Sequence, residues 1–213
     1  MNRVRRFTLG ALLALSAASA FGAAQAGREY ALIDPPQPSG APGKVEVIEF
    51  FSFACPHCNH FEPALEAWRR NLPANVVLRR VPVIFGHGEW LPLAKLEIAL
   101  EALGESDRLA GKVFHALHEE HINLGNPSIC ADWVAHQGVD RQKFLEAFNS
   151  FAVETRTQQA NMKAQAYGID QVPSLVVDGR FRTNPALAGG SNESTLAVVD
   201  ELIQLVDRDR AAH

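Results

Sequence analysis

The chain has 213 residues, of which 47% are apolar and 21% are charged, and its formal net charge is −4. This length and composition suit one globular domain, or one domain with an insertion, and they exclude a disordered chain, a collagen and a coiled coil. A mildly acidic surface also argues against nucleic acid and anionic membranes, so we expect neither as a partner.

The first 26 residues differ from the rest of the chain. They combine a basic start with three arginines, an apolar stretch from Phe7, and the small residues of the sequence AQA at positions 24–26. This pattern predicts a secretory signal peptide cleaved after Ala26, which places the mature protein in a bacterial periplasm. A membrane anchor is the alternative, but the apolar run is short for one. The Arg5-Arg6 pair leaves the export route open between general secretion and twin-arginine export. Cleavage removes three arginines and no acids, which changes the charge from −4 to −7.

The next stretch predicts the start of a sheet domain. Residues 27–44 are rich in proline and glycine, and we expect an extended lead-in. The segment VEVIEFFSF that follows becomes apolar on both faces, which predicts a central strand covered on both sides. Helical spacing begins at once in CPHCNHFEPALEAWRRNL, where Phe61, Leu65 and Trp68 fall on one stripe. The sequence NVVLRRVPVIF then predicts a second strand, which completes a strand-helix-strand unit.

The spacing of apolar residues predicts that residues 90–150 are helical throughout. The first predicted helix of this block ends near Gly104, and the second begins with Ser106 as its expected N-cap. Two more helices follow in PSICADWVAHQG and DRQKFLEAFNSF. A long helix over residues 151–167 then leads back toward the sheet.

The last part predicts a hairpin followed by a helix. SLVV, an Asp178-Gly179 turn and RFRT form the hairpin, and the final helix covers residues 192–207. The order of elements predicts an α/β sheet domain that is interrupted by a helical insertion. The predicted units are a signal peptide at 1–26, the two parts of the sheet domain at 27–87 and 151–213, and the insertion at 88–150.

All three cysteines, Cys55, Cys58 and Cys130, follow the predicted signal peptide. One close pair and one distant cysteine do not make a disulfide scaffold. Two residues separate Cys55 from Cys58 at a strand-to-helix junction, so both lie on one helical face at a spacing that a disulfide can bridge. We expect Cys55 to be an exposed thiolate, favoured by the N–H groups and dipole of the helix, and Cys58 to be less exposed. Cys130, beside Trp133, is expected to be a buried apolar residue.

Pro56 and His57 separate the paired cysteines. Proline suits the first turn of a helix because its missing N–H has no partner there. His57 offers a hydrogen-bond donor or a positive charge, which would stabilise the reduced thiolate and so make the disulfide a stronger oxidant. The alternatives are a surface histidine without effect, an inert structural disulfide, and a metal site that includes His57 and His60. No second Cys-x-x-Cys completes four ligands, so we predict no metal.

A group of three histidines on one predicted helix does not match a zinc signature. H-E-x-x-H fails because isoleucine stands where the second histidine is needed. We expect a polar helix face for these residues, which are His115, His118 and His121.

Two stretches, EFFSFACPHCNHFEP and GIDQVPSLVVDGRF, together resemble the DsbA-type thiol–disulfide oxidoreductases over essentially all of the mature chain. The resemblance implies a thioredoxin fold with an all-helical insertion, together with the low thiol pKa and oxidising disulfide for which the family is known. Cys55 matches the nucleophile, Cys58 its resolving partner, and Pro56-His57 the dipeptide that sets the reduction potential.

The resemblance also assigns a role to Val172-Pro173. This pair matches the cis-proline segment that faces the active site, where an extended peptide can pair with the backbone beside Cys55. From the residues alone, Pro173 could equally be a trans proline that opens a strand.

Three charged residues, Glu49, Glu62 and Arg80, match family positions that modulate the thiol pKa. Glu49 lies in a run that we expect to be buried, so it needs a partner such as Arg80, or a proton exchanged with Cys58. The family usually has lysine where Arg80 stands, and arginine stays charged, which puts proton relay through that position in doubt. Arg79 is the alternative partner, and Glu62 could instead be solvated helix surface.

The sequence therefore predicts an enzyme that donates its Cys55–Cys58 disulfide to newly exported, unfolded proteins. The resemblance implies re-oxidation by a membrane, quinone-linked partner of the DsbB type. We expect a monomer with no cofactor beyond the redox-active disulfide. The rival functions are an exported reductase or isomerase, a metal carrier, and a peptide-binding holdase.

Overall fold

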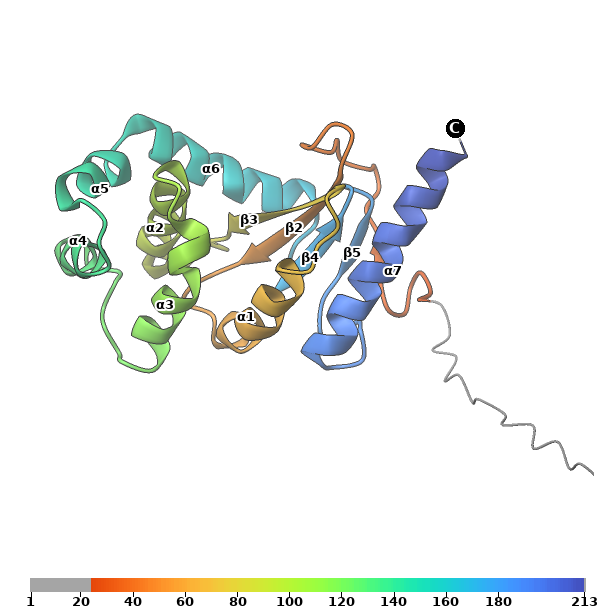
Figure 1. Ribbon diagram of the computed structural model, residues 1–213, viewed down its shortest axis with the longest axis horizontal. Helices are drawn as coiled ribbons and strands as arrows, with labels where there is room; N and C mark the ends of the chain where they lie inside the picture. Colours follow the sequence, from red (N-terminus) through yellow and green to blue (C-terminus); the bar gives the residue numbers. More distant parts are fainter. Residues whose placement is uncertain (1–23, 213) are drawn as a thin grey trace, which may run out of the picture.

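The computed structural model describes residues 24–212, and within that range the central sheet has five strands in the order β1-β5-β4-β2-β3. The strands are β1 Ala31–Leu32, β2 Val45–Phe51, β3 Val76–Pro82, β4 Ser174–Val177 and β5 Phe181–Thr183. β2 runs parallel to β3 and antiparallel to β4. Figure 1 shows this sheet beside a group of helices formed by the middle of the chain. The predicted signal peptide lies outside the described residues except for positions 24–26.

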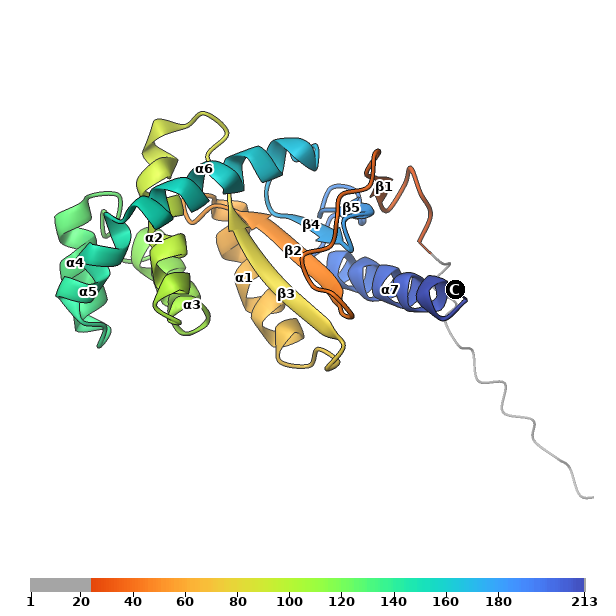
Figure 2. The same cartoon turned by 90° about the horizontal axis from the view of Figure 1, so that it is seen from above.

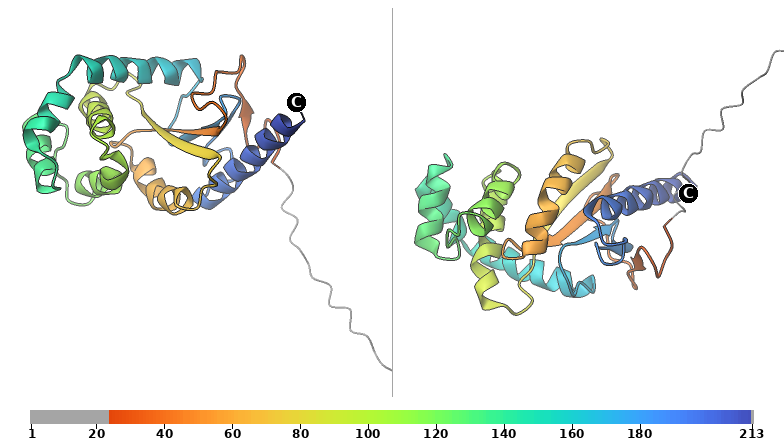
Figure 3. Two further views of the ribbon diagram at one scale, coloured as in Figure 1. Left: turned by 45° about the horizontal axis from the view of Figure 1, so that its top comes forward. Right: turned by 90° about the horizontal axis from the view of Figure 1, so that it is seen from below.

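Helices cover both faces of the sheet. The helices are α1 Pro56–Arg69, η1 Gly88–Trp90, α2 Leu91–Ala102, α3 Ser106–His118, α4 Pro127–His136, α5 Arg141–Phe148, α6 Phe151–Ala166 and α7 Asn192–Ala211. α1 and α7 lie on one face of the sheet and the end of α6 lies on the other (Figure 3). Figure 2 shows α6 running from the helical group to the sheet. None of the helices in the described part of the chain is long and apolar enough to cross a membrane.

β2 lies at the centre of the molecule because its side chains are apolar on both faces. Val45 and Val47 pack against α1 and α7, whereas Ile48 and Phe50 pack on the side of α6. All seven residues of β2 are buried, as its apolar run predicts. The CPHC sequence follows this strand directly, so a rigid, buried element positions it.

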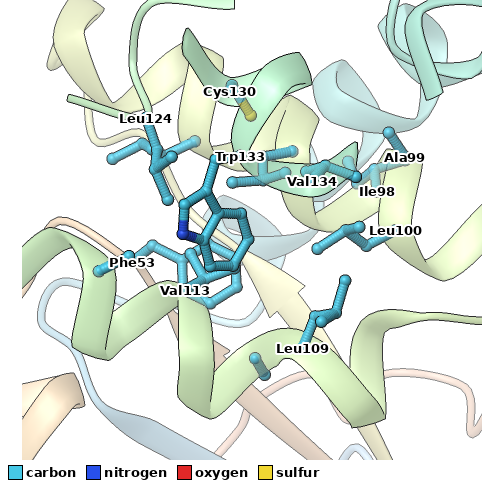
Figure 4. Packing of buried hydrophobic residues seen from close by; sticks show 14 of the residues in the cluster. Phe53, Ile98, Ala99, Leu100, Leu109, Val113, Leu124, Cys130, Trp133 and Val134 are labelled. Carbon is cyan, nitrogen blue, oxygen red and sulfur yellow. The ribbon is translucent and has the colours of Figure 1, made fainter. Parts of the chain in front are cut away.

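The helical group shares its core with the segment before CPHC. Phe51 and Phe53 belong to the same buried cluster as α2, α3 and α4. Figure 4 shows the indole ring of Trp133 extending into this cluster near Val113 and Phe53. Cys130 is fully buried there, as predicted, and burial raises its thiol pKa to about 12.

Three predictions about individual elements were wrong or incomplete. Ser106 is not the N-cap of α3; the helix begins at Ser106 itself, after Glu105, and the Ser106 hydroxyl donates to Glu97 instead. The lead-in also contains β1, which pairs with β5, and α7 continues to Ala211. The exact boundaries of the insertion at 88–150 stay a prediction.

Candidate redox site

Cys55 lies at the start of α1. The chain leaves β2 at Phe51 and turns sharply, because the Cys55 N–H donates to the Ser52 carbonyl at 3.0 Å. Cys55 is the N-cap of α1 with extended backbone angles (φ −85°, ψ 118°), and Pro56 occupies the first turn. The backbone N–H groups of His57 and Cys58 at this helix end therefore point toward the Cys55 sulfur.

The two thiols of the pair have opposite properties. A hydrogen bond from the Cys58 thiol, followed by backbone N–H bonds from Cys58 and His57, lowers the pKa of Cys55 to about 6. Cys58 is fully buried, and burial followed by its bond to Cys55 raises its pKa far above the ordinary value. Both are free thiols in this structure. At neutral pH the pair therefore holds one negative charge, on Cys55, and one proton, on Cys58.

The charge of His57 has the smallest of these effects on Cys55. His57 and His60 are both exposed. The stability of the Cys55 thiolate thus depends mainly on Cys58 and the helix N–H groups. The charge of His57, which we expected from the sequence to stabilise it, contributes least. Between residues 24 and 212, no group of three or more histidine, cysteine or acidic side chains is arranged to hold a metal ion.

Cys55 is less exposed than its place at a helix end suggested. Only 7% of the residue is accessible, because it packs in the cluster that contains Phe53 and has Val172 at its border. The Cys55 sulfur lies 3.7 Å from the Val172 carbonyl oxygen, and the Val172–Pro173 peptide bond is cis. The structure therefore brings together two segments that are far apart in the sequence.

Arg80 is the cation that contacts the predicted carboxylates. In the β2–β3 pair Glu49 lies directly opposite Arg80, and directly opposite residues point to the same face. The Arg80 Nε lies 3.2 Å from a Glu49 oxygen, and its guanidinium also pairs with Glu62. Arg79 pairs with Glu46 instead, at 2.9 Å.

These charged side chains are buried in the protein interior. Glu49 is fully buried, and burial raises its pKa against the opposing effect of Arg80. Burial also raises the pKa of Glu62, which is not a solvated surface residue. The Glu49 charge acts on Cys58 and helps to raise its pKa. A proton-holding carboxyl therefore lies within electrostatic reach of the buried thiol.

Sequence analysis missed two residues that contact this region. Glu97 is 1% exposed on α2 and interacts with Arg80; its signal was a single acid in the apolar sequence LEIAL. His118 was expected on a polar face, but it is half-buried, and its Nε2–H donates to the Phe53 carbonyl at 2.8 Å. No local sequence pattern indicates the contact between His118 and Phe53. His115 and His121 are exposed, as expected.

Comparisons with known proteins match almost the whole chain. A family model described as thioredoxin matches residues 40–194. The thiol:disulfide interchange protein DsbA of Bordetella pertussis is 44% identical over 198 residues, which cover 89% of this chain and 94% of that protein. The DsbA of Pseudomonas aeruginosa is 41% identical over 215 residues, covering 98% of this chain and 99% of that protein. The crystal structure of Pseudomonas aeruginosa DsbA matches with a TM-score of 0.81 at 41% identity, over 89% of this chain and 96% of that one.

The sheet, the helical insertion and the paired thiols define a thioredoxin-fold thiol–disulfide oxidoreductase, which confirms the predicted fold class. The sequence relatives identify the family within this class of protein. The chain belongs to the DsbA-type family of thiol:disulfide interchange proteins. Cys55 and Cys58 are the two closely spaced free thiols of this chain, at the start of α1.

Proposed function

We propose that the protein is a periplasmic dithiol oxidase that donates its Cys55–Cys58 disulfide to newly exported, unfolded proteins. The opposite pKa shifts of the two thiols carry this proposal. The Cys55 thiolate is stable at neutral pH while Cys58 keeps its proton, so the reduced pair is stabilised. A stabilised dithiol makes its disulfide a strong oxidant. Electrons therefore flow from substrate thiols into this protein.

The reaction takes two exchange steps. A substrate thiolate attacks the Cys55 sulfur of the disulfide, a bond forms between them, and Cys58 leaves with the electron pair and takes up a proton. A second substrate thiolate then attacks the substrate sulfur of this mixed disulfide. The substrate gains a disulfide, Cys55 leaves as a thiolate, and two electrons have moved to the protein. The low pKa of Cys55 makes it a good leaving group in the second step.

The residues around the pair have positioning and tuning roles in this proposal. Pro56 starts α1, and His57 lies exposed in the first turn of that helix, where it adjusts the reduction potential of the pair. Val172 offers its backbone to an extended substrate peptide beside Cys55, and Pro173 holds that segment in place.

The buried charges have a separate role. Glu49 gives Cys58 its proton when the disulfide is reduced and takes the proton back on re-oxidation. Its raised pKa supports this exchange, because a carboxyl must be protonated near neutral pH to donate. Arg80 modulates the thiol pKa through its ion pairs with Glu49 and Glu62, and Glu62 does so by sharing the charge of Arg80.

The proposed partners are unfolded proteins with free cysteines and a membrane, quinone-linked oxidase of the DsbB type. Family membership supports both. The basic and apolar start of the chain supports export with cleavage after Ala26. Protein recovered from the periplasm should therefore begin at Gly27 by N-terminal sequencing. Membranes that contain a DsbB-type oxidase should re-oxidise the reduced protein, and membranes without one should not.

The central test is the oxidation of a reduced, unfolded dithiol protein by the purified disulfide form. We expect Cys55→Ser to abolish the activity. Cys130→Ser is the matched control, because Cys130 is buried in the helical part of the chain, and we expect it to retain the activity. Activity that survived Cys55→Ser would overturn the proposal. A redox titration against glutathione decides the direction, since a strongly reducing potential would favour a reductase.

A further inference from the structure

Arg80 stands among several buried or half-buried acids. Its guanidinium contacts Glu49, Glu62 and, at 3.6 Å, Glu66. The Arg80 side chain is only 5% exposed, so water screens its charge little. Glu97 on α2 is a fourth carboxyl that interacts with the same arginine, and the proposed mechanism does not use it.

Glu97 is buried and only partly satisfied. The Ser106 hydroxyl donates to its Oε1 at 2.6 Å, and Ser106 lies inside α3 rather than at its N-cap. Its Oε2 has no hydrogen-bond partner among the described residues, and neither does the Arg80 Nη1. An unpaired carboxylate oxygen in the protein interior is costly, so a buried acid at this position needs an explanation.

An arginine beside Glu49 poses a chemical problem for the proposed proton exchange. Arg80 keeps its charge at every physiological pH, and a fixed positive charge at 3.2 Å favours the ionised form of Glu49 and opposes the effect of burial on its pKa. An ionised Glu49 has no proton to give. Any group that weakens the effect of Arg80 therefore helps Glu49 to remain a proton donor.

We propose that Glu97 is a positioning residue that shares the charge of Arg80 with Glu49 and Glu62, and thereby keeps Glu49 able to exchange a proton with Cys58. This inference rests on the proposed function of Glu49. The electrostatics agree with it, because the Glu97 charge raises the pKa of Glu49 and Arg80 acts on both acids. Burial raises the pKa of Glu97 itself to about 7, so it changes charge near neutral pH.

The groups that face this cluster come from every element packed around it. They are Glu49 on β2, Arg80 on β3, Glu62 and Glu66 on α1, Glu101 on α2 and Ser106 on α3. Glu66 is neutralised by Arg69 at 2.9 Å, and Glu101 by Arg156. A surface hollow of about 260 Å³, lined in part by Arg80, Glu101 and Ser106, opens beside the cluster. Ser106, the hydrogen-bond partner of Glu97, and Arg80 therefore border the same hollow.

The test is a titration of the Glu49 side chain itself. Carbon NMR of the reduced, mature protein with labelled glutamate follows the Glu49 carboxyl as a function of pH. Glu97→Gln keeps the shape and the acceptor for Ser106 but removes the charge. We expect the Glu49 midpoint to fall by about one pH unit in this variant. Ser106→Ala removes the bond that favours ionised Glu97, so it should move the midpoint in the same direction by less.

Glu101→Gln is the matched control, because Glu101 lies one turn further along α2 and is exposed. We expect it to leave the Glu49 midpoint unchanged. A second readout is the pH profile for release of glutathione from Cys55 by Cys58, which should move in the direction of the NMR midpoint. If Glu49 titrates at the same pH in all four proteins, the inference is wrong, even where melting temperatures differ. No protein substrate is present, so the result is independent of whether the enzyme acts as an oxidase.

Discussion

The chemistry of the pair depends more on Cys58 than on any charged neighbour. The Cys58 thiol is the strongest influence that lowers the pKa of Cys55, ahead of the helix N–H groups and of the His57 charge, which is the smallest. The resolving cysteine thus also activates the nucleophile. Without the hydrogen bond from Cys58, mainly the N–H groups at the start of the helix would stabilise the Cys55 thiolate.

Substitution of Cys58 separates these contributions. Cys58→Ala removes the donor, and we expect the pKa of Cys55 to rise from about 6 toward the ordinary thiol value of 9.0. Cys58→Ser keeps a hydroxyl donor and should raise it less. His57→Ala should have the smallest effect of the three. The thiolate absorbance of Cys55 as a function of pH measures each midpoint, and a larger shift in His57→Ala than in Cys58→Ala would contradict this ranking.

At the scale of elements, α3 is tied to the segment that presents CPHC. His118, at the end of α3, donates to the Phe53 carbonyl and stacks on Phe114. Phe53 lies two residues before Cys55, so the helical insertion helps to fix where the helix start lies. The contact joins a helix of the insertion to the turn after β2.

Loss of this contact should reduce stability. His118→Leu leaves the Phe53 carbonyl without its donor, and we expect a cost of about 1–3 kcal/mol in the free energy of unfolding. His118→Gln retains a donor and should recover much of that loss. Urea unfolding of the oxidised proteins measures both values. Equal stability of the leucine and glutamine variants would show that the hydrogen bond does not matter.

The hairpin turn makes a second contact that constrains its glycine. Gly179 has a φ of +67°, and a Cβ there would lie 2.0 Å from the Gln37 carbonyl oxygen. Gly179→Ala should therefore displace the lead-in that carries β1. Gly43 is the control, because its φ is +75° but no atom lies within 4 Å of its Cβ position.

Gly43→Ala should cost about 1 kcal/mol for the backbone conformation alone. Gly179→Ala should cost about 1–3 kcal/mol more, because the backbone of the lead-in must also move. Thermal unfolding of each variant and of the parent protein measures the two losses of stability. Similar melting temperatures for the variants would mean that the lead-in moves away at little cost.

Sequence predicted the elements whose signals are local. The strand-to-helix junction at CPHC, the hairpin and the long helix of α6 all follow from spacing within a short window. Ser106 was misassigned because serine favours an N-cap in general, while a buried acid on the neighbouring helix α2 competes for its hydroxyl here. The contact of His118 with Phe53 spans 65 residues of sequence. β1 has only two residues, which is too short for any periodicity.

At the scale of the whole molecule, the interior holds an acidic cluster that opposes stability at high pH. Burial raises the pKa of Glu97 from 4.5 to about 7, and it raises that of Glu49 in the same direction. A carboxyl with a higher pKa in the folded protein favours folding while it is protonated. Its contribution is complete below the unfolded pKa and is lost as the pH rises through the folded pKa.

We therefore expect the cluster to stabilise the oxidised protein progressively less between about pH 4.5 and pH 8, as first Glu97 and then Glu49 lose their protons. Urea unfolding at a series of pH values, with the disulfide intact, tests this. Glu97→Gln removes one titrating group, so the variant should gain stability relative to the parent as the pH rises. A difference between the two proteins that stayed constant with pH would contradict the assignment of Glu97.

The sheet order has a consequence for the time at which the enzyme becomes active. β4 pairs with β2, and Val172 contacts Cys55, in each case across more than one hundred residues of intervening chain. Contacts of such long range form slowly, because a large loop must close first. Because synthesis starts at the N-terminus, the growing chain contains Cys55 and Cys58 long before it contains Val172 and β4. While the chain is being synthesised and folded, these two sulfurs are exposed to their surroundings. The protein can begin to oxidise other proteins only when the synthesis of its own chain is nearly complete.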